Sequence, residues 1–486
     1  APRLPTARGS DQYSTTAVDA TLTLSALGDF DNVTLLKMLC ETTPRMIFPN
    51  RKIGKLQRGY EASFLVLKHN PLDDLEDLRS IKLRVKNGRM LRQKGKPSQK
   101  PDDETANAES KVSSLAIVDC HVLSMTDGKI LRNQTVLIED NAIAQVGSVN
   151  EIRYPETTNV IDGSGKYVMP GLVDMHVHIG HESELTSYLL HGVTTVCNLG
   201  GDYVDLFSDA EIDVCQLRSR VASGQIMGPR IFSAGQALDG DPRTGPYQRA
   251  LSGPTAAVEA VLEQKEKGFD FIKLYDALDE PTMQAIIRAA LEAELAVIGH
   301  IPEKPGVEKT LASGMHLVAH AEEFYPAFED VDDIDSTARQ LAKRVNESGV
   351  SVIPNTAFVR RIVAQLEDLP AVLADERVAQ LAPRVRRWWT PEYNWYARRD
   401  DPAKFLVDMK QRHAWLIPLV RELHKAGVPL LCGTDSAIPG ALPGFSMIEE
   451  FRDLQLAGLT PLETLQTATI NPARFLYQHA ATESES

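Results

Sequence analysis

Six ionisable residues end or line short apolar runs. His176 and His178 are two residues apart in GLVDMHVH, so on a β-strand both imidazoles would face the same side. The other four are Lys273 in FIKLYD, His300 in AVIGH, His320 in HLVAH and Asp435 in PLLCGTD. Buried ionisable groups are costly unless they are paired or bind a metal. Imidazole and carboxylate suit zinc, manganese, cobalt, iron or nickel. The set therefore predicts one metal site at which these side chains meet.

The runs that carry these residues belong to a regular alternation of strands and helices. Segments between them, such as 253–268 and 280–296, have helical periodicity and capping residues. The candidate strands are residues 171–178, 193–199, 230–235, 271–276, 296–300, 316–320, 350–354 and 429–435. Eight such units predict an α/β fold, a (β/α)₈ TIM-like barrel with its chemistry at the carboxyl ends of the strands. A doubly wound open sheet is the alternative.

One connection in this alternation is much longer than the others. Roughly 75 residues separate Pro354 from Pro429, and they contain Trp388, Trp389 and Trp395. Long excursions after barrel strands often form lids over the site. An additional helical pair whose aromatic side chains only pack would explain the same pattern, so both interpretations stay open here.

The chain before the barrel divides into parts of different composition. Residues 115–169 contain short strands and turns, which we expect to form a small β-sandwich beside the barrel. Residues 92–114 are charged and poor in apolar side chains, which predicts a flexible linker. We expect the barrel to span 170–478 and a tail to follow at 479–486.

The composition excludes several classes of function. The chain has 486 residues, and 52 Lys+Arg against 66 Asp+Glu give a net charge of −14, which argues against a nucleic-acid surface. No run of 18 apolar residues predicts a membrane span, and five scattered cysteines predict no disulfide framework. The first residues lack the apolar segment of a signal peptide, although a signal removed before Ala1 would leave no trace. We expect a soluble protein, with the cytoplasm favoured over the periplasm.

The strand ends and their surroundings resemble the metal-dependent amidohydrolase superfamily. The matching segments are VMPGLVDMHVHIG (168–180), GVTTVCNLGG (192–201), DFIKLYD (270–276), AVIGHIP (296–302), HLVAHAEE (316–323), GTDSAIPG (433–440) and LETLQTATINPARFL (462–476). The resemblance covers residues 115–478 in order. Within the superfamily, the sequence is most similar to the imidazolonepropionase-like branch, which includes Xaa-Pro dipeptidase-like enzymes.

This resemblance implies a centre of two divalent metal ions, with zinc as the expected metal. The implied ligands are His176, His178 and Asp435 for the more buried ion, His300 and His320 for the second ion, and a carboxylated Lys273 that bridges the two. The implied reaction is hydrolysis of an amide or peptide-like C–N bond by a metal-bridging hydroxide, with Asp435 as general acid and base. We expect a small-molecule or dipeptide-like substrate, held in part by Tyr275, Tyr325 and Asn355.

Other functions fit parts of the same pattern. The segment from His300 to Glu303 has the HxxE spacing of mononuclear deaminases in this superfamily, although those enzymes lack a bridging lysine such as Lys273. A hydrolase of cyclic amides or lactones is a related alternative. An inactive scaffold that keeps the ligand residues is the non-enzymatic alternative.

Residues 1–91 resemble the C-terminal part of an amidohydrolase, displaced to the front of the chain. Residues 53–91 are similar to the strands that normally follow the last barrel helix and close the sandwich. Residues 35–48 resemble 462–476, and residues 9–11 resemble 433–435. The chain is therefore a fusion with most of a first unit lost, or a permuted enzyme in which 53–91 complete the sandwich.

We expect this completion to occur within one chain. A flexible linker of about 20 residues spans roughly 25 Å, which is long enough. Exchange of the same strands between two subunits would instead produce a homo-oligomer.

Overall fold

The computed structural model describes residues 36, 64–67, 81–86, 89–91, 114–139, 142–204, 211–245, 247–329, 331–375, 377–378, 381 and 383–480. The chain divides into two units, residues 1–109 and 110–486. In the first unit, an antiparallel sheet has the order β1 (Phe64–Leu67), β2 (Ile81–Lys86), β3 (Arg89–Leu91). The predicted similarities at 9–11 and 35–48 lie outside the described residues except for residue 36, as do residues 92–113 of the predicted linker.

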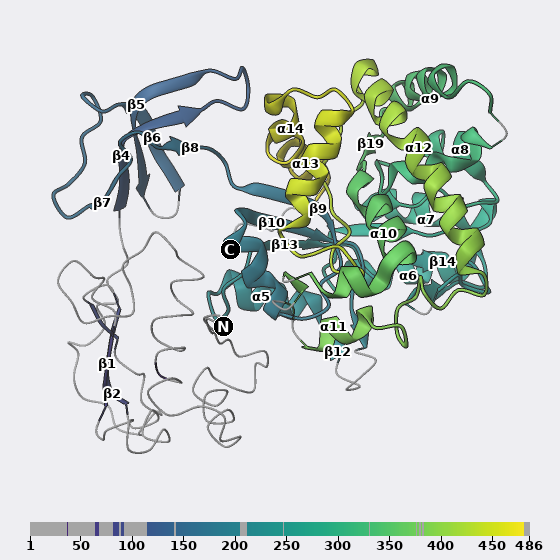
Figure 1. Ribbon diagram of the computed structural model, residues 1–486, viewed down its shortest axis with the longest axis horizontal. Coiled ribbons are helices and arrows are strands. Elements are labelled where there is room, and N and C mark those ends of the chain that lie inside the picture. The colour runs from purple at the N-terminus through teal and green to yellow at the C-terminus, as the bar shows by residue number, and fades with distance from the viewer. Residues whose placement is uncertain are drawn as a thin grey trace, which may run out of the picture. The chain divides into compact units, whose positions relative to one another are not determined.

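The second unit begins with a five-stranded sheet where strands were predicted. β4 (Ser114–Leu123) pairs in antiparallel fashion with β5 (Ile130–Glu139), which pairs with β6 (Ala142–Ser148). β7 (Asn159–Asp162) and β8 (Tyr167–Val168) pair in parallel with β4 (Figure 1). A sheet is therefore present where the sandwich was predicted, and the sandwich itself stays a prediction.

Parallel strands then form two further sheets. The first contains β9 (Leu172–Val177), β10 (Val193–Asn198) and β13 (Arg230–Ser233), with β10 in the middle. The second has the order β15 (Arg249–Ala250), β14 (Leu238–Asp239), β16 (Phe271–Leu274), β17 (Ala296–Gly299), β18 (Leu317–Val318), β19 (Ser351–Val352). A short antiparallel pair, β11 (Tyr203–Val204) and β12 (Glu211–Ile212), stands apart from both.

Isolated parallel bridges connect these two sheets with residues 429–436. The bridged pairs are Ala234–Phe271, Val352–Leu430 and Val177–Ser436. The fold is therefore TIM-barrel-like, but its strands do not form one continuous ladder. The eighth predicted strand, 429–435, forms only an isolated bridge at Leu430, and its last residue, Asp435, leaves the extended conformation with a φ of 54°.

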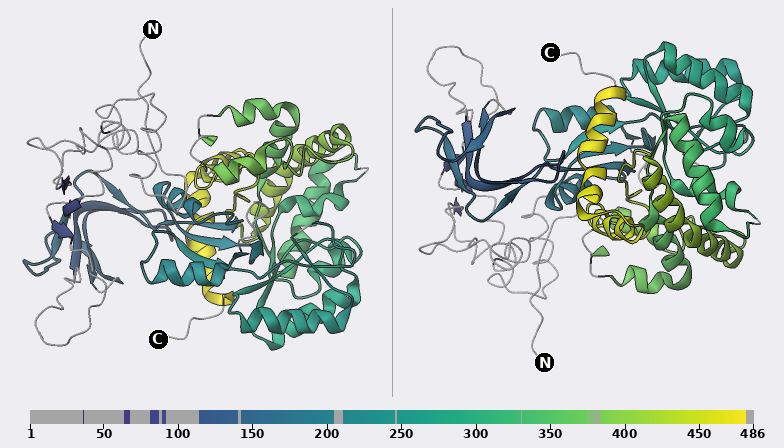
Figure 2. Two further views of the ribbon diagram at one scale, coloured as in Figure 1. Left: turned by 90° about the horizontal axis from the view of Figure 1, so that it is seen from below. Right: turned by 90° about the horizontal axis from the view of Figure 1, so that it is seen from above.

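Helices cover the outside of these strands (Figure 2). They are α4 (Ser183–Leu190), α5 (Val214–Ala222), α6 (Pro254–Glu266), α7 (Glu280–Glu292), α8 (Gly306–Leu311) and α9 (Ile334–Ser348). Asp213, Asp279 and Asp333 cap α5, α7 and α9 by accepting hydrogen bonds from backbone N–H groups of the first turn. Buried apolar side chains of β14, β16 and β17 pack on α6 and α7.

The long connection after β19 is helical. It contains α10 (Thr356–Leu373), α11 (Pro383–Trp389) and α12 (Pro402–Ala426), and α12 packs against α9. Trp389 is fully buried and Trp395 is 52% exposed, so these tryptophans do not share one role. The chain continues through α13 (Ser446–Leu456), α14 (Pro461–Thr467) and α15 (Ile470–His479). Within the described ranges, no helix combines the length and apolarity needed to span a membrane.

Candidate metal centre

β9 and the loop 433–436 are joined through a buried carboxylate. Asp174 accepts hydrogen bonds from the backbone N–H of Thr434 (3.0 Å), from its hydroxyl (2.6 Å) and from the backbone N–H of His176 (3.3 Å). Burial raises the pKa of Asp174 to about 7, although these hydrogen bonds oppose the shift. The backbone N–H of Asp435 also donates to the carbonyl of His176 (2.8 Å). These bonds hold Asp435 beside the end of β9.

Three imidazoles converge on the Asp435 carboxylate. Asp435 Oδ1 lies 3.0 Å from His178 Nε2 and 3.4 Å from His176 Nε2, and Asp435 Oδ2 lies 4.0 Å from His320 Nε2. The two Nε2 atoms of His176 and His178 are 3.3 Å apart. One ligand atom from each of His176, His178 and Asp435 falls within 4.8 Å of the others, which is compatible with a shared metal ion.

Burial prepares the imidazoles for metal binding. Burial, followed by neighbouring cationic groups, holds the pKa of His176 and of His320 well below the usual value. The neutral imidazole is the form that binds metals. The Nδ1 of His176 faces the carbonyl of Ala319 at 3.3 Å, which leaves Nε2 toward Asp435. The residues present therefore fit a divalent cation.

A second group of possible ligand atoms surrounds His300. His300 Nδ1 lies 2.7 Å from Asp276 Oδ1 and 3.2 Å from Glu323 Oε1. Burial alone would lower the pKa of His300. The nearby carboxylates of Glu323 and Asp276 have the larger combined effect, so the pKa of His300 is raised above its usual value. The His300 ring meets the His320 ring edge-on, with centroids 5.0 Å apart, so the second group adjoins the first.

Lys273 lies on β16 and is 2% exposed. Burial lowers the pKa of its amine, while Asp435, Asp276 and Glu323 act in the opposite direction. The amine therefore lies in the electrostatic field of carboxylates from both groups. The structure brings together all six predicted ligand residues at the carboxyl ends of the strands.

The three predicted substrate-binding residues lie in different surroundings. The Tyr275 ring stacks on His300 with centroids 4.1 Å apart. Tyr325 packs instead against the Arg412 guanidinium, 4.4 Å from the ring centroid, and against Trp415. Asn355 follows β19 and is fully buried, and its side-chain nitrogen and oxygen have no hydrogen-bond partner within the described structure.

The model of the amidohydrolase family matches residues 167–478, which is more than half of the chain. The chain belongs to the amidohydrolase family. The predicted enzyme class, a hydrolase of carbon–nitrogen bonds, is thereby confirmed.

Curated relatives carry related names. An ochratoxinase from Aspergillus niger is 23% identical over 400 residues, which covers 75% of this chain and 77% of the relative. An imidazolonepropionase from Pseudomonas syringae pv. tomato is 25% identical over 381 residues and covers 74% of this chain and 86% of the relative. These similarities support the branch that the sequence motifs indicated.

Solved structures share the fold. A Xaa-Pro dipeptidase with bound methionine in its active site matches with a TM-score of 0.57 at 19% identity. The match covers 77% of this chain and 92% of that chain. It supports a TIM-barrel-like amidohydrolase fold for this chain.

Sequence reasoning missed three acidic residues of this amidohydrolase site. Asp174, Asp276 and Glu323 each lie inside a segment that carries the resemblance, within three residues of a predicted ligand. The spacing of Asp174 could have revealed it, since it shares a strand face with His176. Asp276 and Glu323 follow the ends of β16 and β18, and their contacts with His300 depend on how the following loops turn.

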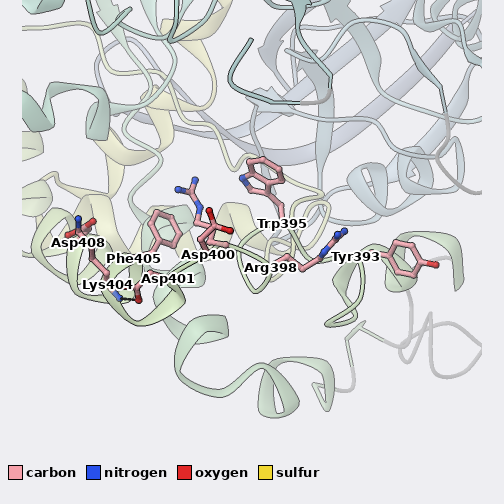
Figure 3. Close-up of a pocket in the computed structure, with 9 residues that line it drawn as sticks. Tyr393, Trp395, Arg398, Asp400, Asp401, Lys404, Phe405 and Asp408 are labelled. Carbon is pink, nitrogen blue, oxygen red and sulfur yellow. Dashed lines mark hydrogen bonds between the residues drawn. The ribbon is translucent and has the colours of Figure 1, made fainter. Parts of the chain in front are cut away.

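A surface pocket of about 600 Å³ lies elsewhere in the amidohydrolase. Nine residues between 393 and 408 line it, among them Trp395, Arg398, Lys404 and Phe405 (Figure 3). The guanidinium carbon of Arg399 lies 3.9 Å from the centroid of the Phe405 ring. The lining includes none of the predicted metal ligands, so the candidate metal centre lies at the strand ends and not in this pocket.

Proposed function

We propose that this amidohydrolase is a metal-dependent enzyme that hydrolyses an amide or peptide-like C–N bond. The observation that carries the proposal is the convergence of three imidazoles on Asp435, at 3.0, 3.4 and 4.0 Å. Such a donor set binds divalent metals such as zinc.

Two ions would be held by the residues that converge here. The proposed ligands are His176, His178 and Asp435 for one ion, and His300, His320 and a carboxylated Lys273 for the other. When bound, the metals would polarise the scissile carbonyl and lower the pKa of a nearby water.

Asp435 is the proposed general base and acid. Asp435 as a whole is 5% exposed, so its carboxylate is shielded from bulk solvent. It would accept the proton of the attacking water and then donate that proton to the leaving nitrogen, which balances the hydrolysis of the amide.

Lys273 is the proposed bridge. A neutral lysine amine adds to CO₂ and loses a proton, giving an anionic carbamate. The burial that lowers the pKa of Lys273 favours the neutral amine. The resulting oxygen ligands would suit cations better than an ammonium group would.

The proposed substrate is a small molecule or dipeptide-like compound with an amide bond. The names of the relatives, ochratoxinase, imidazolonepropionase and Xaa-Pro dipeptidase, support this class without identifying the compound. Tyr275 is the best placed of the three candidate substrate contacts, because its ring stacks on His300. A cyclic amide or a lactone would be hydrolysed by the same reaction.

The deaminase alternative depends on Glu303, and this alternative has weaker support than amide hydrolysis. Glu303 is exposed, whereas the carboxylate that faces His300 comes from Glu323. An inactive scaffold is the remaining alternative, and a test of turnover separates it from an enzyme.

We propose that residues 53–91 supply the strands that complete the sandwich with residues 115–169, within one chain. The resemblance of 53–91 to the closing strands of amidohydrolases supports this arrangement, and exchange between subunits would produce a homo-oligomer instead.

The experiment that tests the proposed function measures hydrolysis before and after metal removal. Wild-type protein is stripped with a chelator, reloaded with Zn²⁺ and bicarbonate, and incubated with a panel of dipeptides and N-acyl amino acids, with products identified by mass spectrometry. We expect activity only after reloading, and full activity in the matched variant Glu303→Gln. Full metal content without turnover on amides, lactones and aminated bases would contradict the proposal, and loss of activity in Glu303→Gln would favour the deaminase.

A further inference from the structure

We propose that Tyr188 is a positioning residue for Asp435, and that its hydroxyl acts through Ser436 to hold the loop that carries the Asp435 carboxylate. This inference rests on the proposed function, because Asp435 is the proposed metal ligand and general base. Tyr188 lies on α4, between two of the segments that carry the family resemblance, 168–180 and 192–201. The resemblance therefore assigned it no role.

The direction of the Asp435 side chain depends on how its backbone is held. Its φ of 54° lies in the left-handed region, which is uncommon for a residue with a side chain, although aspartate adopts it more readily than most. β9 provides part of the support. The backbone N–H of Asp435 donates to the carbonyl of His176 at 2.8 Å, and the backbone N–H of His178 donates to the carbonyl of Ser436.

A chain of hydroxyl groups provides further support from α4. The Tyr188 hydroxyl lies 2.7 Å from Ser436 Oγ, which lies 3.0 Å from Thr434 Oγ1. Thr434 Oγ1 donates to Asp174 Oδ2 at 2.6 Å. Each hydroxyl has one proton to donate. Because Thr434 uses its proton on Asp174, the bond between Ser436 and Thr434 is donated by Ser436. The Tyr188 hydroxyl is then the donor to Ser436.

This chain of hydroxyls is closed off from solvent. Asp174, Tyr188 and Ser436 are 0% exposed, and Thr434 is 1% exposed. Burial raises the pKa of Tyr188 well above its usual value, so the hydroxyl keeps the proton that it donates. Hydrogen bonds in a buried chain strengthen one another, and a member without its partner is costly. Loss of the Tyr188 hydroxyl would therefore loosen the residue next to Asp435.

The helix that carries Tyr188 is itself anchored on two sides. Glu184 lies one turn earlier on the same face of α4, and its Oε2 accepts the backbone N–H of Gly180 at 3.0 Å, in the loop that follows β9. Ser187 Oγ donates to the carbonyl of Pro443 at 2.8 Å. The Tyr188 hydroxyl therefore approaches the Asp435 loop from an element whose own position is fixed.

The test compares Tyr188→Phe, Ser436→Ala and the double variant with the wild type. Phenylalanine removes only the hydroxyl and keeps the ring. Ser187→Ala is the matched control, because it removes a hydroxyl of the same helix whose partner, Pro443, lies beyond the Asp435 loop. The dissociation constants of bound Zn²⁺ are measured on the full chain by competition with a chromogenic chelator. The kcat and KM for an amide substrate are measured at saturating Zn²⁺ with bicarbonate, and thermal unfolding of the metal-free proteins shows whether each variant is folded.

We expect Tyr188→Phe to weaken the binding of one Zn²⁺ ion about tenfold, because partners of a metal ligand typically change metal affinity by 10–100-fold. At full metal occupancy kcat should fall about tenfold with KM nearly unchanged, since a displaced general base affects the reaction more than binding. Ser436→Ala should show at least the same losses. The double variant should show no further loss, because the two groups act along one path. Ser187→Ala should match the wild type.

Wild-type zinc affinities and kcat in Tyr188→Phe would overturn the inference. Losses that multiply in the double variant would overturn it too, because Tyr188 would then act independently of Ser436. Equal losses in Ser187→Ala would contradict a specific role of the Tyr188 hydroxyl. If Tyr188→Phe does not fold, Ser436→Ala alone decides, and wild-type values in that variant would contradict the inference.

These outcomes are separate from a failure of the proposed function. A wild-type chain that binds zinc but hydrolyses no amide would contradict the proposed function, and the zinc affinities of the variants would still decide the role of Tyr188. A wild-type chain that binds no metal would overturn both. Zinc binding and turnover in the wild type, with the same values in Tyr188→Phe, would overturn the inference alone.

Discussion

At the scale of single residues, Asp435 has the central position in the candidate metal centre. Its backbone N–H donates to the carbonyl of His176, and its carboxylate faces three imidazoles. The same side chain is therefore proposed both to bind a metal and to transfer a proton. The left-handed backbone at Asp435 (φ 54°) is unusual for a residue with a side chain and costs free energy. This geometry is consistent with the two roles proposed for Asp435.

We expect Asp435→Asn to lower kcat by about 10²–10⁴-fold, because the amide keeps the shape of the carboxylate but accepts no proton. The measurement is steady-state hydrolysis of an amide substrate by reloaded protein, with metal content determined on the same sample. A variant that keeps its metal and more than a third of the wild-type kcat would contradict the assignment of Asp435 as general base.

Asn355 is a second residue whose conformation suggests function. It has a φ of 49°, which asparagine tolerates. Its two side-chain polar atoms are buried without a partner among the described residues, which is unfavourable in a purely structural role. We expect Asn355→Gly to raise KM about tenfold through loss of a hydrogen bond to substrate. The free energy of unfolding should change by less than about 1 kcal/mol, because glycine accepts a positive φ. A large loss of stability with an unchanged KM, measured by denaturant titration and kinetics, would show that the residue is structural.

At the scale of elements, the strand ends explain why much of the site could be predicted from the sequence. Each of these apolar runs forms a parallel strand, and the carboxyl ends of parallel strands lie at the same edge. The polar residues in the runs are therefore expected at that edge, and they include His176, Lys273, His300 and His320. The partners of those residues could not be predicted in the same way. Glu323 lies on the short helix η3 (Ala321–Phe328) and reaches His300 at the end of β17 through the tertiary fold, which the local sequence does not determine.

The eighth strand illustrates the same limit. The run PLLCGTD has the composition of a buried strand, and its first residues do bridge to β19. The hydrogen bonds of Thr434 with Asp174 draw the following loop into another conformation. Tertiary contacts therefore override the local preference at the very position where a ligand is needed.

Glu450 gives a prediction on stability and pH at this scale. It lies on α13, is fully buried, and accepts hydrogen bonds from the first residues of α10, namely Thr356 N (3.2 Å), Thr356 Oγ1 (2.9 Å) and Ala357 N (2.8 Å). Burial raises the pKa of Glu450 from 4.5 to about 7. Between these values the native state binds a proton that the unfolded state has lost, so the free energy of unfolding falls as pH rises.

The expected contribution of Glu450 to this slope is about −1.4 kcal/mol per pH unit between pH 5 and 7. Glu450→Gln removes the titrating group and should make the slope less negative by about that amount. Buried Glu184, with its pKa raised to about 8, acts in the same direction but is present in both proteins, so the difference isolates Glu450. Identical slopes in urea titrations of the two proteins would refute the assignment.

At the scale of the whole molecule, the small sheet that precedes the barrel has an apolar row across four strands. Ile161, Ile117, Val136 and Val146 are paired in register on β7, β4, β5 and β6. Ile161 and Val146, at the two ends of the row, are 47% and 45% exposed, whereas Val136 in the middle is 4% exposed. Apolar rows of this kind normally pack against a second sheet, which is the role proposed for residues 53–91.

We expect deletion of residues 1–91 to remove the proposed cover of this row, with increased binding of a hydrophobic dye and aggregation in gel filtration. The matched control is deletion of residues 1–48, which keeps the proposed closing strands. The two truncated proteins should differ clearly in dye binding. Equal behaviour would contradict completion of the sandwich by 53–91, and a dimer formed only when 53–91 are present would favour exchange between subunits.

The central claim is that the strand ends hold two metal ions bridged by a carboxylated Lys273. The most direct test is metal content by plasma mass spectrometry, on wild-type and Lys273→Ala protein prepared with Zn²⁺ and bicarbonate. We expect two ions per wild-type chain and one or fewer in the variant. One ion in both proteins would contradict the bridge, and no bound metal in the wild type would contradict the metal centre itself.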